Sequence, residues 1–256
     1  VTDTIGAPTG TVTTKALISN QPYYLPVDGR PTNTVQTLAT NDCRNLGAFI
    51  ENGMIQYVHN TNHPVNNRPT IYYGTINNPA AVSPTVTGYI IFNDTMDFAY
   101  PNISYAGNSS TDNTSIFTFN HSSNKVFGGT SAIRADGLGD FSPVLRIQNG
   151  TTYVNLLAAT QERWGDYSGS QRRYNDPGKV WMSGYNAYFY SGSYPFAHRA
   201  WVTELGLSPF IVTGINNEVK TNTASATVFP NPAKDIFSVE LNLAQPEYLS
   251  FELYDQ

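Results

Sequence analysis

Charge and cysteine are both scarce in this sequence. Of its 256 residues only 13% are charged, and the formal net charge is −5. So weak a charge gives no general attraction to nucleic acid or to anionic membranes, and we expect no nucleic-acid partner. Cys43 is the only cysteine, so no disulfide can form within the chain. The fold must therefore be held by its packed core or by bound ions.

Long hydrophobic runs and helical periodicity are also missing. No apolar segment approaches the roughly 18 residues that a membrane-spanning helix needs. The best helical candidate, residues 156–165, is short and is interrupted by Gly165. The chain opens at Val1 without an initiator Met or a signal peptide, and it ends inside a strand-like pattern. We therefore expect a processed or incomplete chain.

The motifs of common active sites are missing too. The chain has no Gly-x-Ser-x-Gly, no His-Glu-x-x-His and no sialidase-type Ser-x-Asp-x-Gly-x-Thr-Trp box. His59 and His63 are interpreted as polar loop residues, because two ligands alone do not define a zinc site. The sequence thus predicts no catalytic residue and no transition-metal ligand. A pair of carboxylates for glycoside hydrolysis stays open, because any two acids could converge in space, but the sequence spacing favours no particular pair.

Two further charged groups have simple interpretations. Asp136 and Asp140 flank a Gly-rich loop that is either a turn or a calcium site, and calcium is the only cofactor left open. Arg172 and Arg173 are interpreted as a solvated loop, since phosphate or nucleic-acid binding needs far more positive charge.

What the sequence does contain is a series of short apolar runs separated by Gly, Pro, Asn and Asp. Aromatic residues make up 13% of the chain, which argues against disorder. The clearest runs are residues 53–58, 70–74, 88–92, 115–119, 144–147, 180–182 and 200–203. Many short strands at close spacing predict an all-β fold of the sandwich, barrel or propeller type.

A weak internal repeat favours a β-propeller. Residues 41–77, 97–133 and 162–205 each lead from a polar turn through an apolar strand and a long loop into a second strand. Leu46, Ile103 and Tyr167 occupy similar places, and their spacing of about sixty residues suits four-stranded blades with long loops. Three or four blades do not close a ring, so we expect the missing blades upstream of Val1.

The composition changes after residue 207. We predict a propeller-like cargo domain at residues 1–207, incomplete at its N-terminus, and a linker at residues 208–226 that is rich in small polar residues. A new domain then begins at residues 227–256. Pro230 and Pro232 lack a backbone N–H and hold an extended lead-in, after which apolar and polar residues alternate as in a half-buried strand.

These residues carry a family resemblance. Phe229-Pro230-Asn231-Pro232, then Ala-Lys-Asp, then Phe237-Ser-Val239-Glu-Leu241, resembles the opening of the type A C-terminal sorting domain of type IX secretion substrates of Bacteroidota. The resemblance covers residues 222–256 and implies the start of an immunoglobulin-like β-sandwich. It also implies export across the outer membrane, with the translocon and its sorting-domain-binding components as partners. The tail would afterwards be cleaved or replaced by a surface anchor.

A second resemblance lies upstream. The segment is similar to the final-blade pattern of secreted bacterial β-propellers, and it comprises Trp164, Asp166, Tyr167, Ser168, Asp176, Pro177, Trp181, Tyr185 and Trp201. We expect Asp166 and Ser168 to accept backbone N–H groups at a blade corner and the tryptophans to pack between blades.

Two short motifs resemble the O-glycosylation pattern of exported Bacteroidota proteins. Asp3-Thr4-Ile5 and Asp94-Thr95-Met96 have the Asp-Thr-apolar order, so Thr4 and Thr95 are candidate acceptors.

The first hypothesis is a secreted or cell-surface cargo protein of the type IX system. The cargo domain would be a non-enzymatic binding or adhesion module for a glycan or protein, because its composition is rich in Tyr and Asn and weakly charged. The alternative is a secreted hydrolase of glycans or proteins with its active site on the propeller face. A hydrolase should bring two or three acids or an Arg cluster together at the centre of that face, whereas an adhesin should expose aromatic residues on loops.

Overall fold

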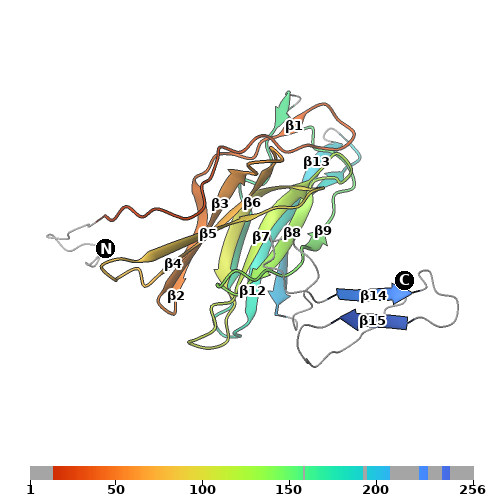
Figure 1. The fold of residues 1–256 in the computed structure, drawn as a ribbon. Coiled ribbons are helices and arrows are strands. Elements are labelled where there is room, and N and C mark those ends of the chain that lie inside the picture. The colour runs from red at the N-terminus through yellow and green to blue at the C-terminus, as the bar shows by residue number, and fades with distance from the viewer. Residues whose placement is uncertain (1–13, 158, 193–194, 208–224, 230–237, 243–256) are drawn as a thin grey trace. The chain divides into compact units, whose positions relative to one another are not determined.

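The computed structural model describes residues 14–157, 159–192, 195–207, 225–229 and 238–242 (Figure 1). All regular structure in these residues is β-strand, in several antiparallel sheets, and none of it is helix. The chain divides into two compact units, Val1–Ile215 and Asn216–Gln256. The predicted all-β class is therefore confirmed, and the described part of residues 156–165 contains the strand β10 (Gln161–Glu162) instead of a helix. This strand pairs in parallel with β1 (Thr37–Leu38).

Three meandering sheets build the larger unit. The first sheet contains β2 (Asn45–Glu51), β3 (Met54–Asn62), β4 (Pro69–Asn77) and β5 (Thr85–Ile91) in that order. The second contains β6 (Asp97–Tyr105), β7 (Ser115–Ser122), β8 (Gly129–Ala135) and β9 (Leu145–Gln148). The third contains β11 (Gly169–Arg172), β12 (Lys179–Phe189) and β13 (Phe196–Gly206). Each of the seven apolar runs named above overlaps one of these strands.

The internal repeat corresponds to these sheets. Its three copies cover β2 to β4, β6 to β8 and β11 to β13. Leu46 lies on β2 and Ile103 on β6, whereas Tyr167 lies in the loop before β11. Hairpin chemistry explains the first tight turn: Asn52 and Gly53 have φ of 50° and 71°, as an Asn-Gly two-residue turn requires.

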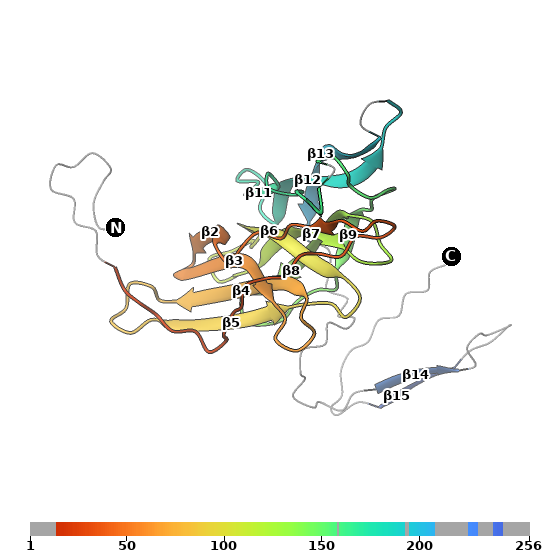
Figure 2. The same ribbon diagram turned by 90° about the horizontal axis from the view of Figure 1, so that it is seen from above.

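The sheets are stacked in chain order. β6 contacts β2, β3 and β4 of the first sheet, while β11 and β12 of the third sheet contact β6, β7 and β8. Figure 2 shows the second sheet between the other two. Because β7 is covered on both faces, all eight of its residues are buried. The second sheet is thus the centre of the unit.

The two interfaces between sheets differ in the size of their side chains. Between the first and second sheets lies an aromatic core, where the ring centroids of Tyr73 and Phe117 are 5.7 Å apart. Between the second and third sheets, Val180 packs against Ile116 and Ala132. Small residues there bring the sheets together: a Cβ on Gly184 would lie 2.8 Å from Thr130 Oγ1.

The N-terminal part of the described chain covers the other face of the first sheet. Ser19 Oγ and the hydroxyl of Tyr72 are 2.5 Å apart, and Asn20 Oδ1 accepts the N–H of Gly88 at 2.7 Å. Tyr24 N–H donates to Thr61 Oγ1 at 2.9 Å. These contacts satisfy polar groups of a sheet face that would otherwise meet solvent.

The smaller unit contains an antiparallel pair of strands. β14 (Ser225–Phe229) pairs with β15 (Ser238–Asn242), so that Val228 lies opposite Val239. β14 begins inside the segment predicted as a linker, because its small residues Ser225 and Ala226 gain partners on β15 that their composition does not reveal. The two strands flank the Pro-Asn-Pro motif in sequence.

One amide side chain links the first strands of all three sheets. Asn102 on β6 donates through Nδ2 to the carbonyl of Leu46 on β2 at 3.1 Å. Its Oδ1 accepts the N–H of Ser170 on β11 at 3.1 Å and the hydroxyl of Ser170 at 2.9 Å. β2 approaches closely, since a Cβ on Gly47 would lie 3.0 Å from the backbone nitrogen of Ile103.

We predict that Asn102→Ala lowers the free energy of unfolding by about 2–3 kcal/mol, because it removes three hydrogen bonds and leaves two backbone groups without their partner. Urea unfolding of the purified chain measures this. The matched control is Asn66→Ala at an exposed position whose Nδ2 makes a long 3.4 Å bond to Asp94, and it should change the value by less than about 0.5 kcal/mol. Equal midpoints for the two variants would contradict the structural role of Asn102.

Candidate functional site

The first strands of the three sheets line a polar groove, which we call the first-strand groove. β2 contributes Glu51, β6 contributes Asn102 and Tyr105, and β11 contributes Arg172, with Tyr174 following in the next loop. Its volume is about 330 Å³. The groove is therefore built from strands that are far apart in the sequence but that each open one sheet, as the three copies of the repeat do.

An arginine held between two aromatic rings dominates this groove. The guanidinium of Arg172 lies 4.5 Å from the ring centroid of Tyr105 and 5.1 Å from that of Tyr174. Its Nη1 donates to Glu51 Oε1 at 2.6 Å. The Arg172 and Glu51 side chains remain 25% and 35% exposed, so the pair is accessible from the groove. Arg172 is thus part of a strand and an ion pair, and its interpretation as a solvated loop residue is wrong.

The loop that carries Tyr174 is held by a cluster of charges. Arg173 pairs with Glu204 and with Asp176, the latter at 3.2 Å, and Lys179 pairs with the same two acids at 3.3 Å and 2.9 Å. Backbone bonds from Arg173 N to Lys179 O and from Asp176 N to Arg173 O close the turn. Tyr174 itself makes no bond within this cluster and is 70% exposed. The cluster therefore presents an aromatic ring at a defined place beside the groove.

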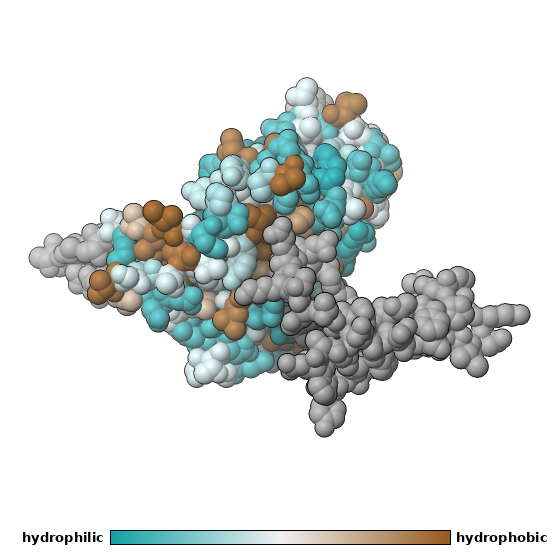
Figure 3. All heavy atoms as spheres, viewed as in Figure 1, coloured by the Kyte–Doolittle hydropathy of each residue, from teal (hydrophilic) through white to brown (hydrophobic). Residues whose placement is uncertain are grey.

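A second concavity is apolar and lies at the third sheet. It has a volume of about 570 Å³ and is lined in part by Trp164, Tyr167, Tyr185, Trp201 and Val202. Tyr167 is 96% exposed in its loop and Val202 is 68% exposed. On the face of the molecule shown in Figure 3, hydrophobic side chains form separate small clusters among hydrophilic ones.

The final-blade residues behave only partly as expected. Trp164 is buried, and its Nε1 donates to the carbonyl of Ala39 at 3.1 Å, whereas Trp181 is 44% exposed. The Asp166 carboxylate pairs with Arg163 at 2.7 Å, and among the described residues no backbone N–H donates to it. Ser168 donates its hydroxyl to the carbonyl of Gly165. In the turn at Gly165–Ser168, the carbonyl of Gly165 thus accepts the serine hydroxyl, and Asp166 takes no part in this hydrogen bond.

A serine–histidine pair is present but inaccessible. Ser131 Oγ and His121 Nδ1 are 2.7 Å apart, a distance at which an imidazole can take a hydroxyl proton. Both residues are completely buried between sheets, so no substrate reaches them. We interpret this pair as internal hydrogen bonding of the second sheet.

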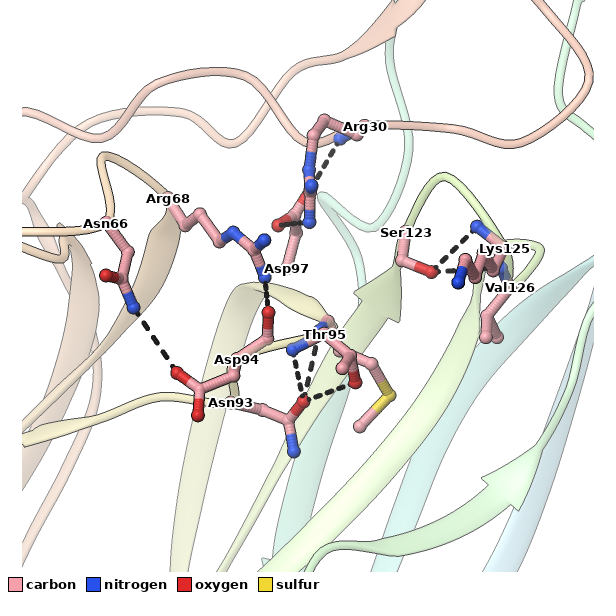
Figure 4. A network of polar contacts seen from close by, with 11 residues as sticks. Arg30, Asn66, Arg68, Asn93, Asp94, Thr95, Asp97, Ser123, Lys125 and Val126 are labelled. Carbon is pink, nitrogen blue, oxygen red and sulfur yellow. Dashed lines mark hydrogen bonds and ion pairs between the residues drawn. The ribbon is translucent and has the colours of Figure 1, made fainter. Parts of the chain in front are cut away.

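The glycosylation candidate Thr95 is exposed in a turn after β5. Asn93 Oδ1 accepts three hydrogen bonds there, from the backbone N–H and the hydroxyl of Thr95 at 2.8 Å each and from the N–H of Met96 at 3.1 Å (Figure 4). The turn therefore holds Thr95 on the surface, and its glycosylation stays a prediction. Thr4 lies outside the described residues.

The calcium candidates form a turn. Asp136 Oδ1 accepts the backbone N–H groups of Leu138, Gly139 and Asp140 at 2.7–3.0 Å. One carboxylate oxygen is thus already used within the loop, and calcium binding stays a prediction. Within the described ranges, no three His, Cys, Asp or Glu side chains gather as metal ligands.

The two histidines four residues apart do not converge. His59 is buried and stacks on Tyr72 with centroids 4.5 Å apart, and its Nδ1 bonds to the carbonyl of Asn60. His63 Nδ1 accepts the N–H groups of Val65 and Asn66. His63 is thus a polar loop residue, as predicted, whereas His59 is a buried strand residue because β3 extends further than its apolar run.

The sorting-motif residues are only partly described. Phe229 ends β14, and Val239 and Leu241 lie on β15. Pro230, Asn231, Pro232 and Phe237 lie outside the described residues. Nor does any helix in the described part of the chain have the length and apolar character to span a membrane.

Comparison of the chain with known protein families, with curated proteins and with solved structures finds no match. No local sequence motif indicates the first-strand groove. The signal that could have found it is the repeat: the strands that open its three copies are the ones that meet there.

His121 provides a pH-dependent test of the core. Burial, reinforced by the positive charge of Arg146, lowers the pKa of His121 from 6.5 to about 4. Between these values the unfolded chain binds the proton and the folded chain does not, so stability falls as the pH falls through this window, by about 3 kcal/mol in total. We predict that His121→Gln removes this part of the pH dependence, measured by urea unfolding at pH 7 and pH 4.5.

The control for this measurement is His198→Gln on β13, where burial lowers the histidine pKa less than at His121, so most of the parent's pH dependence should remain. Parallel pH profiles for the parent and His121→Gln would contradict the depressed pKa.

Proposed function

We propose that this chain is an exported cargo protein of the type IX secretion system whose larger unit is an extracellular binding module. The export part rests on the resemblance of residues 222–256 to a type A sorting domain. The proposed location is the cell surface or the medium, and the proposed partners are the outer-membrane translocon and its sorting-domain-binding components. The strand pair β14–β15 around the Pro-Asn-Pro motif is consistent with the start of a β-sandwich.

For the larger unit we propose a β-propeller-like architecture. Three consecutive meanders stack in chain order with their first strands β2, β6 and β11 side by side, as the inner strands of neighbouring blades do. The open face of the third sheet supports this, because Trp181 and Val202 are exposed where the corresponding face of the second sheet is covered. A further sheet of the same kind would bury them.

The single observation that carries a binding function is the first-strand groove with its exposed Tyr174. Tyr174 stands on the loop that follows β11, and an exposed aromatic side chain on a loop is what is expected of an adhesin. Glu51 is the one acid among the groove residues that the structure describes, and it is paired with Arg172. No convergence of acids in these residues favours the hydrolase alternative.

The export proposal predicts that removal of residues 216–256 and whatever follows them stops secretion. A tagged full-length protein should reach the cell surface or the medium of its native host, and the deleted form should remain in the periplasm. Cell fractionation with immunoblotting measures both. In the converse experiment, a carrier protein fused to residues 216 onward of the full-length protein should be exported. Equal export of the deleted and full forms would show that the tail is not a sorting signal.

The binding proposal predicts saturable attachment without turnover. Fluorescently labelled chain should bind saturably to fixed cells and extracellular matrix of mixed bacterial cultures, measured by flow cytometry against unlabelled competitor. In parallel, chromogenic glycan and protein substrates should release no product. Product release that is abolished by Glu51→Gln would establish a hydrolase instead, and a lack of saturable attachment would contradict the proposal.

A further inference from the structure

We infer that the first-strand groove binds a neutral glycan, with the ring of Tyr174 as a stacking surface and the Glu51–Arg172 pair as its hydrogen-bonding partner. This inference rests on the proposed binding function and assigns it a ligand class and a site.

Tyr174 provides the apolar contact. A pyranose ring presents a face of C–H groups, and such a face packs on the electron-rich face of an aromatic ring. Tyr174 is 70% exposed, and one of its faces is already directed toward the Arg172 guanidinium at 5.1 Å. Tyrosine is enriched at contact surfaces because its ring is apolar while its hydroxyl can still form a hydrogen bond.

The Glu51–Arg172 pair supplies polar contacts of both kinds. A guanidinium has five N–H donors, and the hydrogen bond to Glu51 uses only Nη1. A carboxylate accepts several bonds at once, so the pair offers donors and acceptors side by side. Neighbouring hydroxyls of a sugar both donate and accept, and they match such a pair.

The charge of the site separates neutral from acidic glycans. Glu51 balances Arg172 at 2.6 Å, so the groove lacks the uncompensated positive charge that a carboxylate or sulfate would require. The chain as a whole is negative, with a formal net charge of −5. An acidic polysaccharide would be repelled, whereas a neutral one is unaffected by this field.

The groove is ordered before binding. Arg172 is packed between the rings of Tyr105 and Tyr174, and Asn102 holds the three strands that form the floor. A preorganised site loses little side-chain entropy on binding. Its volume of about 330 Å³ lies at the lower end of the range for small-ligand sites.

The test is affinity electrophoresis of the full chain in gels that contain soluble polysaccharides. The neutral probes are dextran, laminarin, mannan and xyloglucan, and the acidic probe is alginate. We expect retardation by at least one neutral polymer and none by alginate. For the retarding polymer, calorimetry with its oligosaccharides should show Kd raised at least tenfold by Tyr174→Ala and by Arg172→Gln.

The matched control is Tyr167→Ala, which removes another exposed tyrosine outside the groove and should bind like the parent. Tyr174→Ala keeps the test valid if Arg172→Gln fails to fold, because Tyr174 is largely solvent-exposed. Retardation by alginate alone, an unchanged Kd for Tyr174→Ala, or an equal loss in Tyr167→Ala would overturn the inference.

Absence of retardation by every neutral polymer would overturn it as well. If the chain then still attached saturably to cells, the proposed binding function would stand with a different ligand. If attachment were lost too, both would fail.

Discussion

The Asn102 amide is the contact on which the arrangement of the larger unit depends. A carboxamide carries a donor and an acceptor at opposite corners of one plane, and here they connect β2 and β11 to opposite sides of β6. A hydrophobic residue could separate these strands but could not set their relative height, because dispersion forces have no direction. The floor of the first-strand groove is therefore defined by hydrogen bonds rather than by packing.

The size of the core side chains then determines how far apart neighbouring sheets lie. Phenyl rings such as those of Phe117 and Phe119 fill the space between the first two sheets, while alanine and threonine line the other interface. Because Cys43 is the only cysteine, no disulfide within the chain stabilises the fold. The described strands are held together by this layered core and by many hydrogen bonds between uncharged groups. Buried polar residues such as Asn60 and Thr118 give the interior a mixed character, in which amides and hydroxyls lie beside aromatic rings.

The sequence predicts the strands with apolar runs well and the strands at the groove poorly. β3, β4, β7 and β12 contain short runs that are rich in Ile, Val, Tyr and Phe, and such β-branched and aromatic residues are typical of strands. β11 reads Gly-Ser-Gln-Arg and has no apolar side chain at all. The repeat located it indirectly, but nothing local indicates a strand.

β6 is difficult to recognise as a strand from the sequence for a different reason. It contains Pro101 and is interrupted by a register shift, with Tyr100 at a φ of 53°. Such features argue against a strand when they are read from sequence alone. The polar and irregular strands are the ones that line the groove, so the candidate site is concentrated where pattern-based prediction is weakest. The pairing of Arg172 with Glu51 across 121 positions likewise has no local signal.

The neutral character of these contacts has a consequence for the surroundings in which the protein can work. Dissolved salt screens interactions between exposed charges over about 10 Å at 0.1 M and over shorter distances in brine. An amide that bridges strands, or a ring that stacks on a ring, is affected far less. The hydrogen bonds of Asn102 and the aromatic layers should therefore be equally stable in dilute and in concentrated salt. The partly exposed ion pairs, such as those of the loop that carries Tyr174 and the Glu51–Arg172 pair, should weaken as the salt concentration rises.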